Sequence, residues 1–117
     1  MSDVEAPVLA AVRNRIGHLT LNRPGGLNAL TLPMVRLLQQ HLQTWEQDQD
    51  VVAVVLRAAG EKAFCAGGDI SGMERRMSAP AGEIGFNGWH RQQRVHHTQS
   101  LLHTMPKPTV AVLNGVA

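Results

Sequence analysis

The feature that most constrains the fold of this chain is an apolar run that leads into two successive glycines. Residues 51–56 are continuously apolar and rich in β-branched side chains, a pattern typical of a strand covered on both faces in a parallel sheet. The loop that follows reaches Gly67 and Gly68 where a helix is predicted to begin. Helix N-termini offer unsatisfied N–H groups and a positive dipole end, and glycines leave those donors accessible. The stretch 63–70 is therefore predicted to stabilise a partial negative charge, such as a carbonyl oxygen or a phosphate, with main-chain donors.

A β-hairpin is predicted near the start of the chain. Residues 8–12 and 16–21 have the character of two strands, with residues 13–15 at or near their turn. In the second strand polar side chains alternate with leucines, as a half-buried strand requires. His18 is therefore interpreted as an outward-facing strand residue rather than a catalytic one.

An amphipathic helix is predicted between the hairpin and the apolar run. Thr31 is a suitable N-cap, and Pro33 is tolerated in the first turn that follows it. An apolar face recurs at helical spacing, and residues 48–50 end the helix. This face consists of Val35, Leu38, Leu42 and Trp45. Trp45 is therefore interpreted as a core residue rather than a ligand platform, and strand, helix and strand form an α/β unit. Ligands of such units bind at the carboxyl ends of the strands.

The second half of the chain is predicted to continue the α/β pattern. A short helix is expected over residues 73–77, a glycine-containing loop over 78–88 and a longer helix over 89–104. Residues 106–108, Pro-Lys-Pro, stop that helix. Residues 109–113 are then expected to form a final strand of the buried type.

Composition limits the class of protein. A chain of 117 residues has room for one domain at most, and 44% hydrophobic with 17% charged residues indicate a packed chain. A formal net charge of +2 does not by itself indicate a protein that binds nucleic acid. The charges are unevenly distributed, because every acidic residue lies at or before Glu83. The segment after Glu83 is therefore basic. Its charge is interpreted either as a solvated helix face or as a surface that attracts an anionic ligand.

One cysteine excludes an internal disulfide. The sequence shows no signal peptide or membrane span, so a cytoplasmic location is expected.

Side-chain chemistry offers weaker candidates than the glycine loop. Cys65 follows the pattern of a thiol near a helix N-terminus, but sequence assigns it no base, and a small packed residue is the favoured interpretation. Asp69 is interpreted as a helix-stabilising carboxylate rather than a base. The adjacent His96 and His97 diverge on a helix, and other histidine pairs lie two turns apart. No metal site is therefore predicted.

Three segments, in order and spacing, resemble those of the crotonase family, the enoyl-CoA hydratases and isomerases. Residues 62–73 (KAFCAGGDISGM) are similar to the first oxyanion-hole segment of that family. Residues 16–30 resemble its N-terminal hairpin and coenzyme A loop, and residues 106–117 resemble the strand that leads to its second glycine motif. Together these segments cover most of the chain from about Val8 onward.

The resemblance implies the N-terminal part of a crotonase-like ββα superhelix, with residues 1–117 forming a portion of one domain. It implies an acyl-CoA thioester as substrate, no cofactor apart from that coenzyme A, and a carbonyl polarised by two backbone N–H groups. Gly68 matches the first donor. Gly26 and Leu27 match the coenzyme A loop, and Met73 matches an acyl-pocket position. The residues expected at the substrate are Gly26, Leu27, Ala66, Gly68, Asp69, Ile70 and Met73.

The chain also departs from the family pattern. Gly25 and Ser71 stand where lysines are frequent, and neither the second glycine motif nor the acid/base glutamates of the hydratases is present. The chain is therefore expected to be catalytically incomplete, as the front of an enzyme that forms trimers or hexamers. Hydration or isomerisation of an enoyl-CoA is the preferred activity. The alternatives are thioester cleavage, because Cys-Ala-Gly-Gly-Asp also resembles the 3-hydroxyisobutyryl-CoA hydrolases, and a non-catalytic fragment that binds coenzyme A weakly.

Overall fold

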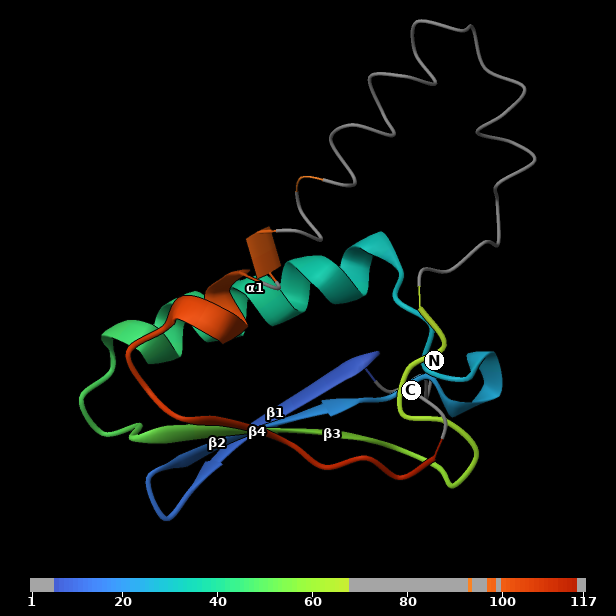
Figure 1. Ribbon diagram of the computed structural model, residues 1–117, viewed down its shortest axis with the longest axis horizontal. Helices are drawn as coiled ribbons and strands as arrows, with labels where there is room; N and C mark the ends of the chain where they lie inside the picture. The colour runs from blue at the N-terminus through green and yellow to red at the C-terminus, as the bar shows by residue number, and fades with distance from the viewer. Residues whose placement is uncertain (1–5, 68–92, 94–96, 99, 116–117) are drawn as a thin grey trace, which may run out of the picture.

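The computed structural model describes residues 6–67, 93, 97–98 and 100–115, which form one four-stranded sheet with helices on one face (Figure 1). The elements in chain order are β1 (Val8–Arg13), β2 (Ile16–Leu21), the 3₁₀ turn η1 (Pro24–Gly26), α1 (Leu32–Gln47), β3 (Ala53–Ala58) and β4 (Thr109–Ala111). The strands lie in the order β1-β2-β3-β4. The predicted α/β class is confirmed.

Strands β1 and β2 form the predicted hairpin. They pair antiparallel, from Val8 opposite Leu21 to Arg13 opposite Ile16. The two turn residues, Asn14 and Arg15, have φ values of 51° and 66°. Positive φ at both central positions is the geometry that matches the right-handed twist of a two-residue hairpin. β1 therefore continues one residue beyond the predicted end, to Arg13.

Helix α1 connects two parallel strands and covers the sheet, packing against β1 and β2. It begins as predicted, because the Thr31 hydroxyl accepts a hydrogen bond from the Met34 N–H at 3.3 Å. It ends before Asp48. The buried residues of the helix are Met34, Val35, Leu38, Leu42 and Trp45. The predicted apolar face is thus confirmed, and Met34 adds a contact that the spacing argument left out.

Trp45 packs on a glycine of the sheet. A Cβ atom added to Gly17 would lie 2.6 Å from Trp45 Cζ3 and 2.9 Å from Trp45 Cδ2. Gly17 is buried at the middle of this contact, between the hairpin turn and Leu19. The absence of a side chain on β2 therefore sets how closely the indole approaches the strand, and the core assignment of Trp45 is confirmed.

Strand β3 differs from its prediction in position and in cover. It runs over Ala53–Ala58 instead of 51–56. The Val52 N–H donates to the Arg15 carbonyl in the hairpin turn, and the regular pairing of β3 with β2 begins at the next residue. Within β3 only Val54 is buried. The expected cover on both faces is wrong for the described residues, because the helices they contain lie on one side of the sheet (Figure 1).

Strand β4 is parallel to β3, as expected, but it is short and exposed. Its residues Thr109, Val110 and Ala111 are all exposed, with Val110 at 54%. β4 is one of the two edge strands of the described sheet and pairs there only with β3. The prediction of a buried strand over 109–113 was therefore wrong for this part of the chain, because apolar composition indicates a strand without showing which neighbours cover it.

A second helical segment lies beside α1 (Figure 1). Of the helix predicted over 89–104, the described residues 93, 97–98 and 100–104 are all helical, and Met105 is buried in the core. The predicted helix over 73–77 and loop over 78–88 fall outside the described residues. No helix within the described ranges is long and apolar enough to cross a membrane.

Lys107 closes the C-terminus of α1. Its Nζ donates to the carbonyl oxygens of Trp45 and Asp48, the latter at 2.5 Å. A cation at this helix end satisfies orphan carbonyls and complements the helix dipole. We expect Lys107→Met to lower the free energy of unfolding by about 1–2 kcal/mol in a urea titration. The exposed Lys62 serves as control, and Lys62→Met should change stability by less than about 0.5 kcal/mol. Equal effects of the two substitutions would contradict this role.

Candidate functional site

Three loops meet where the parallel strands end. Residues 22–31 follow β2, residues 59–67 follow β3 and residues 112–115 follow β4. Because β2, β3 and β4 are parallel, their carboxyl ends lie at one edge of the sheet (Figure 1). We call these three segments the loop cluster. This edge is where open α/β sheets bind ligands.

Asn28 holds the first two loops together. Its side chain is fully buried, and its Oδ1 accepts from the Arg23 N–H at 2.7 Å. Its Nδ2 donates to the carbonyl oxygens of Ala59 and Ala63 at 2.9 and 3.0 Å. A short carboxamide provides both an acceptor and two donors, so one side chain satisfies backbone groups of two loops. Its φ of 55° is a conformation that asparagine adopts more readily than most residues.

The loop that leads from β3 to Gly67, which we call the glycine loop, is hydrogen-bonded through its main chain to the loop after β2. Ala66 N–H donates to the Leu27 carbonyl at 3.1 Å, and Leu30 N–H donates to the Gly67 carbonyl at 2.7 Å. Gly67 has a φ of 99°, a conformation that L side chains rarely adopt. These bonds fix the path of the chain up to the point at which the predicted oxyanion donor, Gly68, follows.

Gly26 and Leu27, the residues predicted to contact coenzyme A, lie in this same cluster. Both N–H groups are used within the turn, with Gly26 donating to the Arg23 carbonyl and Leu27 to the Pro24 carbonyl. The Leu27 side chain is 44% exposed. Arg23 packs over Gly26, where an added Cβ would lie 2.7 Å from Nη2, and its Nη1 donates to the Ala29 carbonyl at 2.8 Å. A ligand at this loop would therefore contact the exposed Leu27 side chain next to the Arg23 guanidinium, which is fixed by its hydrogen bond to the Ala29 carbonyl.

The segment after β4 packs directly on the loop after β3. Asn114 Nδ2 donates to the Gly60 carbonyl at 2.6 Å. A Cβ on Gly115 would lie 2.5 Å from the Lys62 carbonyl oxygen, which is too close for any side chain. The region that resembles the approach to the family's second glycine motif thus lies against the loop that leads to the first.

The structure brings together Gly26, Leu27 and Ala66 among the predicted site residues. Four others lie outside the described residues: Gly68, Asp69, Ile70 and Met73. The sequence analysis assigned no role to Asn28. The one available signal was an asparagine between the apolar residues Leu27 and Ala29, where a buried side chain would have to form hydrogen bonds. The sequence also predicted main-chain contacts of Ala66 to coenzyme A, and the Ala66 N–H donates instead to the Leu27 carbonyl.

Cys65 lies beside the core. Its side chain is half-buried and packs against the hydrophobic cluster, and its Sγ lies 3.9 Å from the Gly67 carbonyl oxygen. The interpretation of Cys65 as a small packed residue is confirmed. Among the described residues there is no group of three or more His, Cys, Asp or Glu side chains placed to hold a metal ion.

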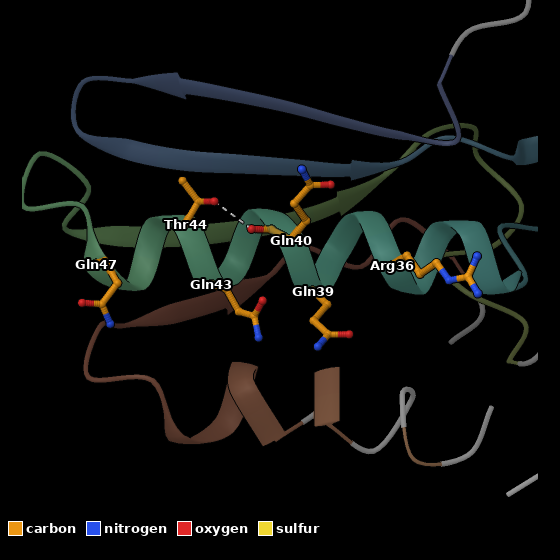
Figure 2. A pocket seen from close by; sticks show the side chains of 6 residues that line it. All are labelled: Arg36, Gln39, Gln40, Gln43, Thr44 and Gln47. Atoms are coloured by element: carbon orange, nitrogen blue, oxygen red, sulfur yellow. Dashed lines mark hydrogen bonds between the residues drawn. The ribbon is translucent and has the colours of Figure 1, made fainter. Parts of the chain in front are cut away.

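A groove of about 600 Å³ on α1 is larger than the hollow of about 410 Å³ between the loops after β2 and β3, but it offers little chemistry (Figure 2). Gln39 and Gln43 point toward the second helical segment, while Gln40 and Thr44 point away from it (Figure 2). The side chains that line it are Arg36, Gln39, Gln40, Gln43, Thr44 and Gln47. Neutral carboxamides can bind polar groups but supply neither a nucleophile nor an acid or base at neutral pH. We therefore place the candidate site at the strand ends.

Two histidines make stability depend on pH. Burial lowers the pKa of His41, whose ring lies 5.8 Å from that of Trp45. Burial, with the nearby charges of Arg13 and Arg57, lowers the pKa of His18 below its ordinary value of 6.5. In the unfolded chain both rings bind a proton more readily than in the folded chain, so acid favours unfolding.

We therefore expect the free energy of unfolding to fall as the pH is lowered through about 6.5. Urea titrations between about pH 7.5 and pH 5 measure this dependence. Replacing both rings, as His18→Gln with His41→Gln, should flatten the profile in that window. A wild-type profile that rises toward acid pH, or one unchanged in the double variant, would contradict the assignment.

Comparisons with known proteins agree on one family. The enoyl-CoA hydratase/isomerase family model matches residues 16–117. The chain is 37% identical over 115 residues to a mitochondrial 3-hydroxyisobutyryl-CoA hydrolase from Danio rerio, covering 98% of this chain and 29% of the relative. The chain thus spans less than a third of that relative's length.

Solved structures give the same result. An enoyl-CoA hydratase from Rhodobacter sphaeroides superposes with a TM-score of 0.83 at 37% identity, covering 94% of this chain and 32% of the other. A carnitinyl-CoA dehydratase from Mycobacterium thermoresistibile superposes with a TM-score of 0.85 at 34% identity, covering 96% and 32%. The family model spans most of the sequence and the sheet matches these folds, so the chain belongs to the enoyl-CoA hydratase/isomerase family, also called the crotonase family.

Proposed function

We propose that this chain forms the part of an acyl-CoA enzyme that binds the thioester and polarises its carbonyl oxygen with backbone N–H groups. The observation that carries the proposal is the paired backbone of residues 27–30 and 66–67 at the strand ends. This pairing fixes the chain immediately before Gly68, the proposed first donor. The remaining proposed contacts to the substrate are those of Gly26, Leu27, Ala66, Asp69, Ile70 and Met73.

The physical reason is charge development on the thioester oxygen. Negative charge accumulates on that oxygen when water adds to the β-carbon of an enoyl-CoA, when a proton is removed from the carbon next to the thioester, or when water attacks the carbonyl carbon. Fixed donors favour that state over the neutral substrate, and removal of one donor typically costs about 2.7–4 kcal/mol of transition-state stabilisation. Asn28 and Gly67 would act by positioning this loop, since the first ties it to its neighbour and the second adopts the backbone conformation it needs.

The reaction that follows polarisation has two candidates. Family membership and the solved hydratase support addition of water to, or isomerisation of, an enoyl-CoA. The curated relative, named as a 3-hydroxyisobutyryl-CoA hydrolase and similar over 98% of this chain, supports thioester cleavage. Both candidates use the same polarised carbonyl, so the described loops serve either reaction. We propose that the protein acts as a homo-oligomer in the cytoplasm, without a cofactor other than the coenzyme A of the substrate.

Product analysis separates the candidates. The protein that contains this sequence should be incubated with crotonyl-CoA and, separately, with 3-hydroxyisobutyryl-CoA. A hydratase gives 3-hydroxybutyryl-CoA from the first and releases no thiol. A hydrolase releases coenzyme A thiol from the second, with the oxygen of water in the new carboxylate. Failure of the folded protein to bind or convert either thioester would overturn the proposal.

A further inference from the structure

The loop after β3 is held by side chains from two directions. On one side the Asn28 Nδ2 bonds the carbonyl oxygens of Ala59 and Ala63. On the other side the Asn114 Nδ2 donates to the carbonyl oxygen of Gly60, which lies between these two anchored positions. Asn28 belongs to the loop after β2 and Asn114 to the segment after β4, so all three segments of the loop cluster meet here.

Close packing leaves this part of the loop little freedom to move. A Cβ added to Gly115 would lie 2.7 Å from the Lys62 carbonyl carbon and 3.0 Å from the Ala63 nitrogen. Gly60 has a φ of 87°, and a Cβ there would lie 3.0 Å from the Cβ of Pro24. Because closely packed groups transmit displacement, a shift of the segment after β4 would move the loop after β3 with it.

The carboxamide of Asn114 is poorly suited to a role in stability alone. Its Oδ1 is buried and has no donor among the residues that the structure describes. A buried acceptor without a partner costs free energy of the same order as one hydrogen bond contributes, so the two ends of the side chain roughly offset each other. Buried polar groups that break the rule of hydrogen-bond satisfaction are expected at functional positions.

The anchored part of the loop leads directly to the glycine loop's hydrogen bonds. Ala63 lies three residues before Ala66, whose N–H is bonded to the Leu27 carbonyl. Backbone donors stabilise a developing oxyanion when they lie about 2.7–3.1 Å from it. A misplacement of about 1 Å can cost on the order of a hundredfold in rate. A side chain that fixes this loop against the segment after β4 therefore acts on the rate through geometry.

We propose that Asn114 is a positioning residue, which fixes the segment after β4 against the loop after β3 and thereby sets where the glycine loop presents its backbone N–H groups. This role rests on the proposed function. Asn114 acts through Gly60 and not on the reacting atoms. Because the donors favour the charged state over the neutral substrate, loss of Asn114 should lower kcat more than affinity.

The test uses the protein that contains this sequence and compares the wild type with Asn114→Ala and Asn114→Asp. Aspartate keeps the shape but turns an oxygen toward the Gly60 carbonyl. We expect kcat for the thioester that the wild type converts to fall about 10- to 100-fold in both variants. KM and the affinity for butyryl-CoA should change by less than about threefold. The urea midpoint of Asn114→Ala should stay within about 0.5 M of the wild type.

Hydrogen–deuterium exchange gives a readout that needs no turnover. Residues 59–67 should exchange at least about tenfold faster in Asn114→Ala than in the wild type. Thr44→Ala is the matched control, because it removes one side-chain hydrogen bond to a backbone carbonyl, that of Gln40, on α1 (Figure 2). It should change neither this exchange nor kcat. If Asn114→Asp fails to fold, Gly115→Ala forces the same two segments apart.

The outcomes separate this role from the proposed function. Wild-type exchange of residues 59–67 in a folded Asn114→Ala would overturn the positioning role, as would a loss of affinity as large as the loss of kcat. A wild-type protein that binds and converts no thioester, together with faster exchange in Asn114→Ala, would overturn the proposed function and retain the placement of the loop by Asn114. Turnover by the wild type that is unchanged in Asn114→Ala would do the reverse.

Discussion

Asn28→Ala is expected to lower the free energy of unfolding by about 3 kcal/mol or more, because it leaves three backbone groups without their partner. The Arg23 N–H and the Ala59 and Ala63 carbonyl oxygens all bond the Asn28 side chain, which is fully buried. Water cannot replace these bonds without opening the loops. Urea titration of the wild type and the variant measures the change.

A shape-conserving variant separates hydrogen bonding from packing. Asn28→Asp keeps the side-chain volume but turns a donor into an oxygen that faces the Ala59 and Ala63 carbonyls, so it too should be strongly destabilising. The exposed carboxamide of Gln43 is the control, and Gln43→Ala should change stability by less than about 0.5 kcal/mol. Near wild-type stability of Asn28→Asp would show that the bonds are not the reason Asn28 matters.

Gly17→Ala is expected to cost about 2–3 kcal/mol, because the new methyl group would overlap the indole of Trp45. Both residues are buried, so relief requires a shift of the ring or of β2. Gly25 is the matched control, since a Cβ there meets no atom within 4 Å and Gly25→Ala should be close to neutral. Thermal or urea unfolding gives both values.

A double-mutant cycle tests the cause. On a Trp45→Leu background the smaller side chain leaves room for the methyl group, so the cost of Gly17→Ala should fall by at least about 1 kcal/mol. If the cost is the same on both backgrounds, the loss arises in β2 itself and not from the contact with Trp45.

Local patterns predicted the elements well where the cause of the structure is itself local. Thr31 satisfies the first turn of α1 with its own hydroxyl, and the spacing of Leu38, Leu42 and Trp45 places them on the buried face. The hairpin follows from alternation and from a turn that tolerates positive φ. These signals lie within a few residues of the structure they specify.

Features set by distant contacts were missed or misplaced. β3 begins at Ala53 because its register is fixed by pairing with Ile16, which the apolar run does not reveal. The exposure of Val110 depends on which elements cover the sheet. Asn28 became visible as a tie only when the loop at Ala59 and Ala63 was placed against it. The apolar run and the two glycines after it pointed to the glycine loop, but they did not distinguish a thioester oxygen from a phosphate, and only the family resemblance suggested the thioester.

The most direct test of the central claim is calorimetric titration of the protein with butyryl-CoA, comparing the wild type with Gly67→Ala and with Gln43→Ala, an exposed position on α1 outside the loop cluster. Alanine at Gly67 meets no neighbour within 4 Å, but the φ of 99° is strained for any L side chain, so the loop must shift. We predict saturable binding by the wild type, binding about tenfold weaker in Gly67→Ala, equivalent to about 1.4 kcal/mol, and little change in Gln43→Ala. A folded wild-type protein that shows no saturable binding, or a Gly67→Ala variant that binds as tightly as the wild type, would contradict a thioester site at this loop.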